Sequence, residues 1–245
     1  MGLSDTIRTR PLAVLFGLAA ISLLALFLLA PPVPQDQTYH QFADRHDLLG
    51  VPNFWNVVSN LPFILVGALG LWRVRGVPAA QVIFLGVFLT GFGSSYYHWQ
   101  PDDAGLFWDR LPMAIGFMAI LSYVIEDRID AKVGAALFWP LVALGVASLL
   151  LWRWTGDLRL YGWVQFFPCV VLLLVFWLFP SKQSGDGYWF AAAGLYVLAK
   201  VLEYADATVF SALHVMSGHA LKHLAAAAAC YAILRAVEAR RPIVF

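Results

Sequence analysis

The chain has 245 residues, of which 61% are hydrophobic and only 13% are charged. A soluble domain is about 45–50% apolar and about 25% charged, so this composition excludes an ordinary soluble protein. The 16 basic and 15 acidic residues give a net charge of +1, which lacks the basic excess of a nucleic-acid-binding protein. The two cysteines, Cys169 and Cys230, lie in apolar runs and cannot form a disulfide framework. These observations leave a multi-spanning membrane protein.

Eight apolar stretches follow one another along the chain with short connections. A bilayer core about 30 Å thick is crossed by about 20 helical residues, because each residue adds about 1.5 Å. The stretches lie at residues 12–30, 53–73, 79–99, 106–126, 132–152, 161–180, 187–204 and 214–235. No connection is long enough for a soluble domain, so we expect an all-α polytopic membrane helix bundle.

The first stretch resembles a secretory signal because Arg8 and Arg10 precede it. Its apolar run is longer than the core of about 7–15 residues that a signal peptide has, and it is followed by two prolines in place of a cleavage pattern of small residues. We therefore expect a retained helix. Residues 1–52 would form a membrane anchor helix and an outer loop, and residues 53–245 would form a seven-helix membrane domain.

Basic residues gather at one end of the expected helices. Cytoplasmic loops of membrane proteins carry an excess of Lys and Arg. If the N-terminus lies in the cytoplasm, the inner basic residues are Arg8, Arg10, Arg73, Arg75, Arg128, Lys132, Lys182, Arg235, Arg240 and Arg241, and the outer ones are Arg45, Arg153 and Arg159. This imbalance predicts that both termini are cytoplasmic.

All the histidines fall at the opposite, outer end, together with several carboxylates. They are His40, His46, His98, His214, His219 and His223, with Asp102, Asp103, Asp109, Glu203 and Asp206 beside them. An ionisable group costs several kcal/mol inside a bilayer, so one that faces a bundle interior is a candidate for function. Ser94, Asp109, His219 and His223 come from three helices at expected depths of about 5–14 Å. This shared depth predicts a site.

The spacing within two helices indicates what kind of site this is. His219 and His223 are four residues apart, so both rings project from one helix face and can share a metal ion. Ser94 and His98 have the same spacing. Three neutral imidazoles with a fourth position open to water are a common arrangement for catalytic zinc, whereas Mg²⁺ and Ca²⁺ prefer oxygen ligands.

Each of these residues also has a simpler interpretation when taken alone. His98 can be a hydrogen-bonded residue at the membrane interface, Asp109 can pair with Arg110 or cap a helix, and Ser94 can bond back to its own helix. The histidine pair on one helix also suits haem or a proton relay. Their gathering on one side of the membrane at matched depth favours a metal site.

Four motifs carry a resemblance to a known family. They are FWNVVSNLP at 54–62, GSxxxH at 93–98, WDRLPM at 108–113 and HxxxH at 219–223. In their order, intervals and helix placement they resemble the alkaline ceramidases over residues 53–235. That family belongs to a superfamily of seven-helix membrane hydrolases that includes the adiponectin receptors and haemolysin III relatives.

The resemblance implies a set of roles. His98, His219 and His223 would be zinc ligands, with Asp109 and Ser94 as catalytic partners beside the metal. Zinc lowers the pKa of a water toward about 7 and polarises a carbonyl. Asp109 would pass the water proton to the leaving amine, and Ser94 would hydrogen-bond the developing oxyanion. The implied reaction cleaves ceramide, or a related N-acyl membrane lipid, to a free fatty acid and a sphingoid base.

The sequence departs from the family pattern in two places. Alkaline ceramidases of eukaryotes carry an acidic calcium-binding segment with a glutamate just before the Phe-Trp-Asn motif, and here that position is Asn53. Asp44, His46 and Asp47 lie nearby but out of register. This departure speaks against calcium dependence. The second departure is the helix at 12–30, for which we expect an anchoring role.

Two other functions stay open from the sequence alone. The chain can be a receptor-like or regulatory relative whose zinc is structural, or a haem or transport protein that uses the same histidines. Transport is disfavoured, because the ionisable residues within the helices gather toward one side and do not continue through the membrane. The short loops and the N-terminal arginine pair favour a bacterial inner membrane, with the active site toward the periplasmic face.

Overall fold

The structure is a computed structural model that describes residues 9–180 and 184–240. Throughout this part of the chain the regular structure is helical, and no strand is present apart from an isolated bridge between Leu48 and Val51. Among the residues described, seven helical spans are long and apolar enough to cross a membrane. The prediction of an all-α polytopic bundle is therefore confirmed.

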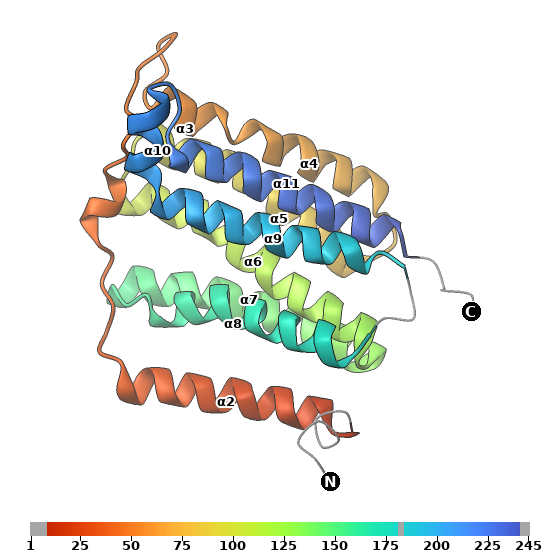
Figure 1. Ribbon diagram of the computed structural model, residues 1–245. Coiled ribbons are helices and arrows are strands. Elements are labelled where there is room, and N and C mark those ends of the chain that lie inside the picture. The colour runs from red at the N-terminus through yellow and green to blue at the C-terminus, as the bar shows by residue number, and fades with distance from the viewer. Residues whose placement is uncertain (1–8, 181–183, 241–245) are drawn as a thin grey trace. The chain divides into compact units, whose positions relative to one another are not determined.

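The contacts divide the chain into two compact units, whose helices are labelled in Figure 1. The first unit comprises residues 9–35 and 114–180, and the second comprises residues 36–113 and 184–240. The first unit contains α2 (Pro11–Leu29), the later part of α6 (Asp103–Arg128), α7 (Ala131–Thr155) and α8 (Arg159–Leu178). The second contains η1 (Gln37–His40), α3 (Phe54–Val58), α4 (Leu61–Arg73), α5 (Pro78–Trp99), the start of α6, α9 (Asp186–Tyr204), α10 (Asp206–Leu213) and α11 (Gly218–Glu238).

Each of the eight expected stretches contains a long helix, with three differences. The stretch at 53–73 is interrupted at Ser59 and Asn60, so that α3 and α4 together make one span. α9 matches the stretch at 187–204 but falls short of the other seven in apolar composition. The last helix begins at Gly218 and not at residue 214, because the chain turns at residues 214–217 after α10 ends at Leu213.

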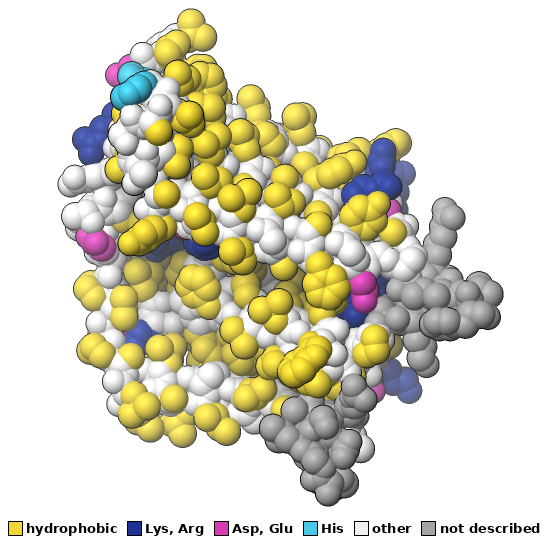
Figure 2. All heavy atoms as spheres, in the orientation of Figure 1, with side chains coloured by type: hydrophobic (Ala, Val, Ile, Leu, Met, Phe, Trp, Pro, Cys, Tyr) yellow, Lys and Arg dark blue, Asp and Glu magenta, His cyan; other side chains and the backbone are white. Residues whose placement is uncertain are grey.

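Hydrophobic side chains cover most of the length of the helices on the face shown in Figure 2, while most charged side chains lie near helix ends. Large apolar residues are well exposed in both units, among them Leu29 at 83% and Leu65 at 68%. None of the residues of α2 is buried. Such surfaces are typical of helices that face lipid.

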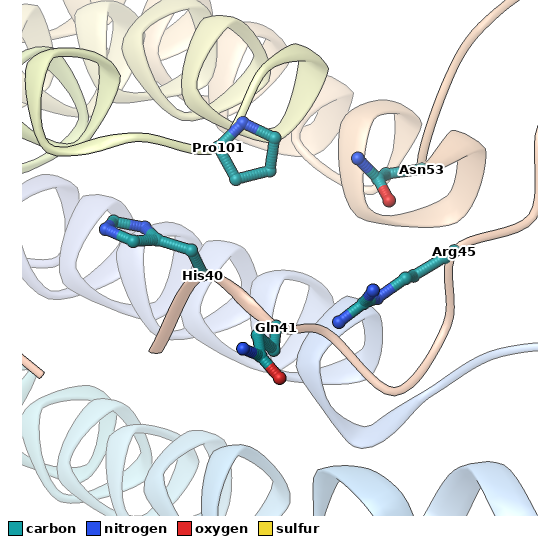
Figure 3. A pocket seen from close by; sticks show the side chains of 5 residues that line it. All are labelled: His40, Gln41, Arg45, Asn53 and Pro101. Atoms are coloured by element: carbon teal, nitrogen blue, oxygen red, sulfur yellow. The ribbon is translucent and has the colours of Figure 1, made fainter. Parts of the chain in front are cut away.

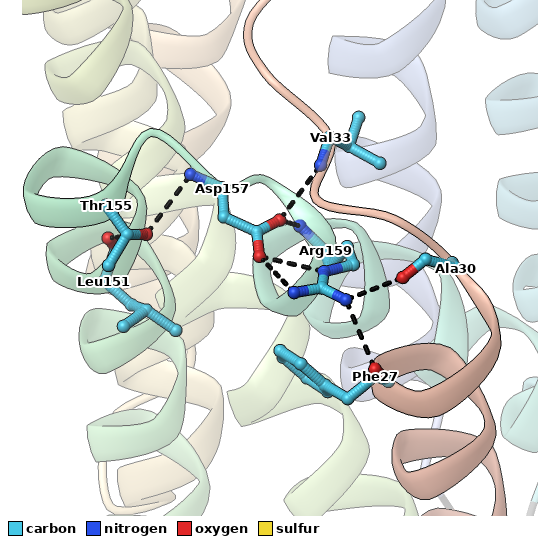
Figure 4. Close-up of polar contacts among 7 residues, drawn as sticks. All are labelled: Phe27, Ala30, Val33, Leu151, Thr155, Asp157 and Arg159. Atoms are coloured by element: carbon cyan, nitrogen blue, oxygen red, sulfur yellow. Dashed lines mark hydrogen bonds and ion pairs between the residues drawn. The ribbon is translucent and has the colours of Figure 1, made fainter.

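In the first unit, a charged cluster holds the end of α2 to the start of α8 (Figure 4). One carboxylate oxygen of Asp157 accepts a hydrogen bond from the backbone of Val33 at 3.2 Å, and the other pairs with Arg159 at 2.7 Å. Arg159 in turn donates to the carbonyl of Ala30 at 2.7 Å. The connection between α7 and α8 therefore satisfies backbone groups that α2 leaves unpaired at its C-terminal end.

In the second unit, small residues allow the helices to approach closely. A Cβ on Gly67 of α4 would lie 2.4 Å from the backbone nitrogen of Phe88 in α5, so only glycine fits there. α11 packs along α9 and α4, and many of its buried residues are alanines. Small residues at helix contacts are the usual means of close packing in membranes. This packing sets the start of α11 next to the end of α5.

We predict that Asp157→Asn lowers the melting temperature at pH 7 by about 2–4 °C, because about 1 kcal/mol of charged hydrogen bonding is lost. Burial raises the pKa of Asp157, but the hydrogen bonds from Arg159 outweigh it and hold the pKa below its usual range. A carboxyl group whose pKa is lower in the folded state than in the unfolded state stabilises the fold above pH ~4. This stabilisation is lost as the pH falls further and the carboxylate is protonated. The difference in melting temperature between Asp157→Asn and the wild type should therefore become smaller at acidic pH.

Thermal melts at pH 7 and at about pH 3 test this prediction, since the lower value lies beneath the ordinary carboxyl pKa. Asp47→Asn is the matched control, because the exposed carboxylate of Asp47 makes no hydrogen bond or ion pair within the described residues. Equal melting of Asp157→Asn and the wild type at pH 7 would contradict the structural role of this cluster.

Candidate metal centre

Three histidines that the sequence singles out converge in the second unit. His98 lies in the last turn of α5, and His219 and His223 lie in the first two turns of α11. One ring nitrogen from each lies within 4.8 Å of the others. All three residues are buried, with exposed fractions of 1%, 5% and 6%. The four-residue spacing on α11 turns both of its rings toward His98, as expected for neighbours on one helix face.

Not all ring nitrogens of this cluster have a hydrogen-bond partner among the described residues. Nδ1 of His223 is hydrogen-bonded to the hydroxyl of Ser59 at 2.8 Å, which leaves Nε2 for another partner. Within the described residues, Nδ1 of His98 and Nε2 of His219 are buried without any hydrogen-bond partner. A buried polar atom without a partner costs about 1–3 kcal/mol. A cation that accepts imidazole lone pairs would remove this cost, so the donor set fits a metal such as zinc.

His219 is positioned by Asp206, which lies in the first turn of α10. One carboxylate oxygen of Asp206 accepts a hydrogen bond from the backbone nitrogen of His219 at 2.7 Å, and the other accepts one from the backbone of Ala43 at 3.0 Å. Ser217 caps α11 by accepting from the backbone of Ala220. These contacts satisfy backbone donors at the start of a helix.

His214 takes no part in this arrangement. It follows α10 in the left-handed conformation, with φ of 56°, and is exposed. The expected start of the last helix at residue 214 is therefore wrong, and His219 lies in the first turn of α11 instead of more than a turn inside it. The reason is local: the Ser217 cap starts a new helix after the chain has turned.

His98 is fixed by the segment that precedes α3. The side-chain amide of Asn53 donates to the carbonyl of His98 at 2.9 Å. The ring of Phe42 lies 4.7 Å from the His98 ring and 4.8 Å from the His219 ring, measured between centroids. The segment from residue 42 to residue 53 thus contacts two of the three histidines and closes the buried cluster on that side.

Ser94 and Asp109 are brought together beside the histidines. Ser94 is buried one turn before His98 on α5, and its side chain lies beside the carboxylate of Asp109 on α6. The two helices touch here because position 93 is glycine: a Cβ on Gly93 would lie 2.2 Å from the carbonyl oxygen of Trp108. Ser94 therefore lies where α5 contacts α6.

A second polar cluster lies on another side of α11. Lys222 contacts one carboxylate oxygen of Glu203 at 2.5 Å, and Lys200 contacts the other at 2.8 Å. The hydroxyl of Tyr39 donates to Glu203 at 3.1 Å. Burial, and then the charge of Glu203, raise the pKa of Tyr39, so the tyrosine keeps its proton as a donor. These half-buried charged groups are paired with one another.

For several residues that shape the site, the sequence alone does not reveal their role. Ser59 belongs to the motif at 54–62, but nothing in the motif says that it contacts a histidine of α11. In the sequence, Asp206 is only one of several outer carboxylates, Phe42 lies outside the expected helices, and Asn53 lies at the start of one. Their roles depend on contacts between segments that are far apart in the chain, such as the contact between Ser59 and His223, which are separated by 164 positions.

We predict that Gly93→Ala lowers the melting temperature by several degrees, because the added methyl group forces α6 away from α5 at a cost of about 1–3 kcal/mol. Gly194→Ala is the matched control, since a Cβ at Gly194 meets nothing within 4 Å. Circular dichroism melts of the two variants measure the difference. The close approach of the two helices is refuted if both variants melt like the wild type.

We also predict that Ser59→Ala weakens metal binding by about 10–100-fold, because His223 loses the hydrogen bond that orients its ring. Competition against a chelator of known zinc affinity measures this effect. Ser211→Ala serves as control, because Ser211 is exposed and bonds only to its own helix. An unchanged zinc affinity in Ser59→Ala would show that this hydrogen bond does not orient a ligand.

A comparison with known protein families gives the same family that the four sequence motifs resemble. A family model described as Ceramidase matches residues 50–242, which is most of the chain. The matched segment contains the three histidines together with Ser94 and Asp109. None of the curated proteins compared with the chain matches it. The chain therefore belongs to the ceramidase family, whose members are hydrolases that act on the amide bond of ceramide.

Proposed function

We propose that this protein is a zinc-dependent intramembrane amidohydrolase that cleaves ceramide, or a related N-acyl lipid, to a free fatty acid and a sphingoid base. The observation that carries the proposal is the buried histidine cluster, whose ring nitrogens lie within 4.8 Å of one another. Two of these nitrogens lack any other partner among the described residues. Family membership supports the ceramide amide as the bond that is broken.

His98, His219 and His223 would hold the metal. Three neutral nitrogen donors favour zinc over Mg²⁺ or Ca²⁺, which prefer oxygen. When bound in such a site, zinc polarises the amide carbonyl and lowers the pKa of a water. Ser59 would support the site through its hydrogen bond to Nδ1 of His223, which leaves Nε2 of that ring for the metal.

Asp109 would transfer the proton of the reaction, and Ser94 would stabilise the negative charge that develops on the substrate. A carboxylate oxygen of Asp109 would accept the proton of the attacking water and deliver it to the amide nitrogen as the carbon–nitrogen bond breaks. The Ser94 hydroxyl, which lies beside Asp109, would donate to the carbonyl oxygen as negative charge develops there. The backbone approach at Gly93 would keep the two side chains together.

Calcium has no part in this proposal. The position where the related enzymes carry a glutamate is the neutral Asn53, and its amide donates to the carbonyl of His98. Asp44 nearby is fully buried and pairs with the ring of His46 at 2.9 Å. The segment before α3 would therefore be held by contacts within the protein.

The membrane arrangement is proposed from the distribution of basic residues. The N- and C-termini would be cytoplasmic, and the metal site would open toward the periplasmic face of a bacterial inner membrane. The amide of an N-acyl lipid lies at the headgroup boundary. This level would be close to the end of α5, which carries His98, and to the start of α11, which carries His219. Residues 1–52 would serve as anchor and outer loop, and residues 53–245 as the hydrolase domain.

We predict that the purified protein contains about one zinc per chain and releases fatty acid from ceramide. His219→Ala should lose both the zinc and the turnover. Asp109→Asn should retain the zinc and lose at least about 100-fold in turnover, because it removes the proton acceptor and not a ligand. His214→Ala, which alters an exposed histidine outside the cluster, should behave like the wild type.

Elemental analysis and fatty-acid release from ceramide in detergent micelles measure these outcomes. Protein without zinc would refute the metal site, and a Soret band would point to haem. Zinc without any release of fatty acid from N-acyl sphingoid lipids would favour a receptor-like or regulatory role, in which the metal is structural.

A further inference from the structure

A second feature, outside the histidine cluster, is a polar pocket of about 350 Å³ in the second unit. It is lined by His40, Gln41, Arg45, Asn53 and Pro101 (Figure 3). Asn53 forms part of its wall and also holds the carbonyl of His98. The pocket therefore lies directly beside the chain segment that carries one of the proposed zinc ligands.

His40 forms a fixed part of this wall. Its Nδ1 is hydrogen-bonded to the hydroxyl of Tyr97 at 2.9 Å, and its Nε2 to the carboxylate of Asp103 at 3.0 Å. Tyr97 is almost fully buried and precedes His98 in the chain. Since both ring nitrogens are occupied, His40 orders the pocket and leaves the binding of a ligand to its neighbours.

Three side chains in the pocket have unused hydrogen-bonding groups. Within the described residues, Arg45 uses only its Nε, which donates to the carbonyl of Phe42 at 3.1 Å, and forms no ion pair. The side-chain amide of Gln41 and the amide oxygen of Asn53 make no hydrogen bond in the same residues. Figure 3 shows the Arg45 guanidinium extending into the space between Gln41 and Asn53.

These groups combine donors with acceptors. The guanidinium offers only donors, the Asn53 oxygen offers an acceptor, and the Gln41 amide offers both. A hydroxyl group both donates and accepts, so a group with several hydroxyls would match such a lining. Planar side chains such as Arg and the amides can also contact two neighbouring hydroxyls at once.

The charges around the pocket argue against a phosphate or another anion. Asp44 precedes Arg45 in the chain, Asp102 follows Pro101, and Asp103 is paired with His40. Arg45 is the one lining residue with a permanent positive charge, and the carboxylate of Asp103 lies 3.0 Å from the ring of His40, another lining residue. An anionic headgroup would be repelled by this carboxylate, whereas a neutral group would not.

The size of the pocket exceeds what a free sphingoid hydroxyl needs. The pocket volume of about 350 Å³ is many times the volume of one water-sized group. A single hydroxymethyl group would fill only a small part of this space. A sugar ring, with its hydroxyls, is of the right order of size.

We propose that this pocket binds a neutral sugar headgroup on the terminal oxygen of the sphingoid base, so that glycosylated N-acyl sphingoid lipids are substrates as well as free ceramide. The inference rests on the proposed function, because the headgroup would occupy the pocket while the amide lies at the histidine cluster. Arg45 and Gln41 would determine headgroup specificity without touching the reacting atoms.

The test compares three substrates with the zinc-loaded, full-length protein in detergent micelles: ceramide, hexosylceramide and ceramide 1-phosphate. Fatty-acid release should give a kcat/KM for hexosylceramide at least equal to that for ceramide, and a lower value for the phosphate. Arg45→Gln should raise KM for hexosylceramide about tenfold, through the loss of one or two hydrogen bonds. It should change KM for ceramide less than about twofold and leave kcat unchanged for both.

Gln41→Leu provides a second variant with the same expected pattern, and Arg153→Gln, an exposed arginine of α7 outside the pocket, is the matched control. The proposal is overturned if ceramide is cleaved and hexosylceramide is not, if the phosphate is preferred, or if both pocket variants affect the two neutral lipids equally. If no N-acyl lipid is cleaved, the failure lies with the proposed function itself.

Discussion

The need to satisfy buried polar atoms is the constraint on which the second unit depends. A cluster of imidazoles closed off from water leaves nitrogens that must find a partner, and two of them find none among the described side chains. Neighbouring polar groups are paired, Ser59 with His223 and Lys222 with Glu203. Two of the unpaired buried atoms therefore lie in the histidine cluster, where a metal ion would supply the missing interaction.

The packing of the helices serves the same constraint. Glycines allow α5 to approach α4 at Gly67 and α6 at Gly93, so that side chains from different helices meet within hydrogen-bonding distance. Asp206 and Asn53 then fix the backbone at two of the three histidines. Since imidazole ligands must be held in one orientation to bind a metal well, rigid backbone at these positions is what such a site requires.

The sequence predicts the helices and the convergence of the histidines because both follow from local rules. Apolar length defines the spans, and a spacing of four residues places His219 and His223 on one face. The roles of Ser59 and Asp206 could not be predicted, since they depend on contacts across more than one helix. The expected start of the last helix is too early because the apolar Val215 and Met216 extend the pattern back to residue 214, and the Ser217 cap is a weaker signal than the pattern.

The separation of the site residues along the chain has a consequence for biogenesis. Ser59 and His223 lie 164 residues apart, and so the hydrogen bond between them can form only after nearly all of the chain has been synthesised. A nascent protein that has inserted α5 holds a single imidazole of the cluster, whereas a metal held by this cluster would need all three. Metal would therefore be acquired after the last helix has entered the membrane, so that incompletely inserted chains stay without the metal and without its chemistry.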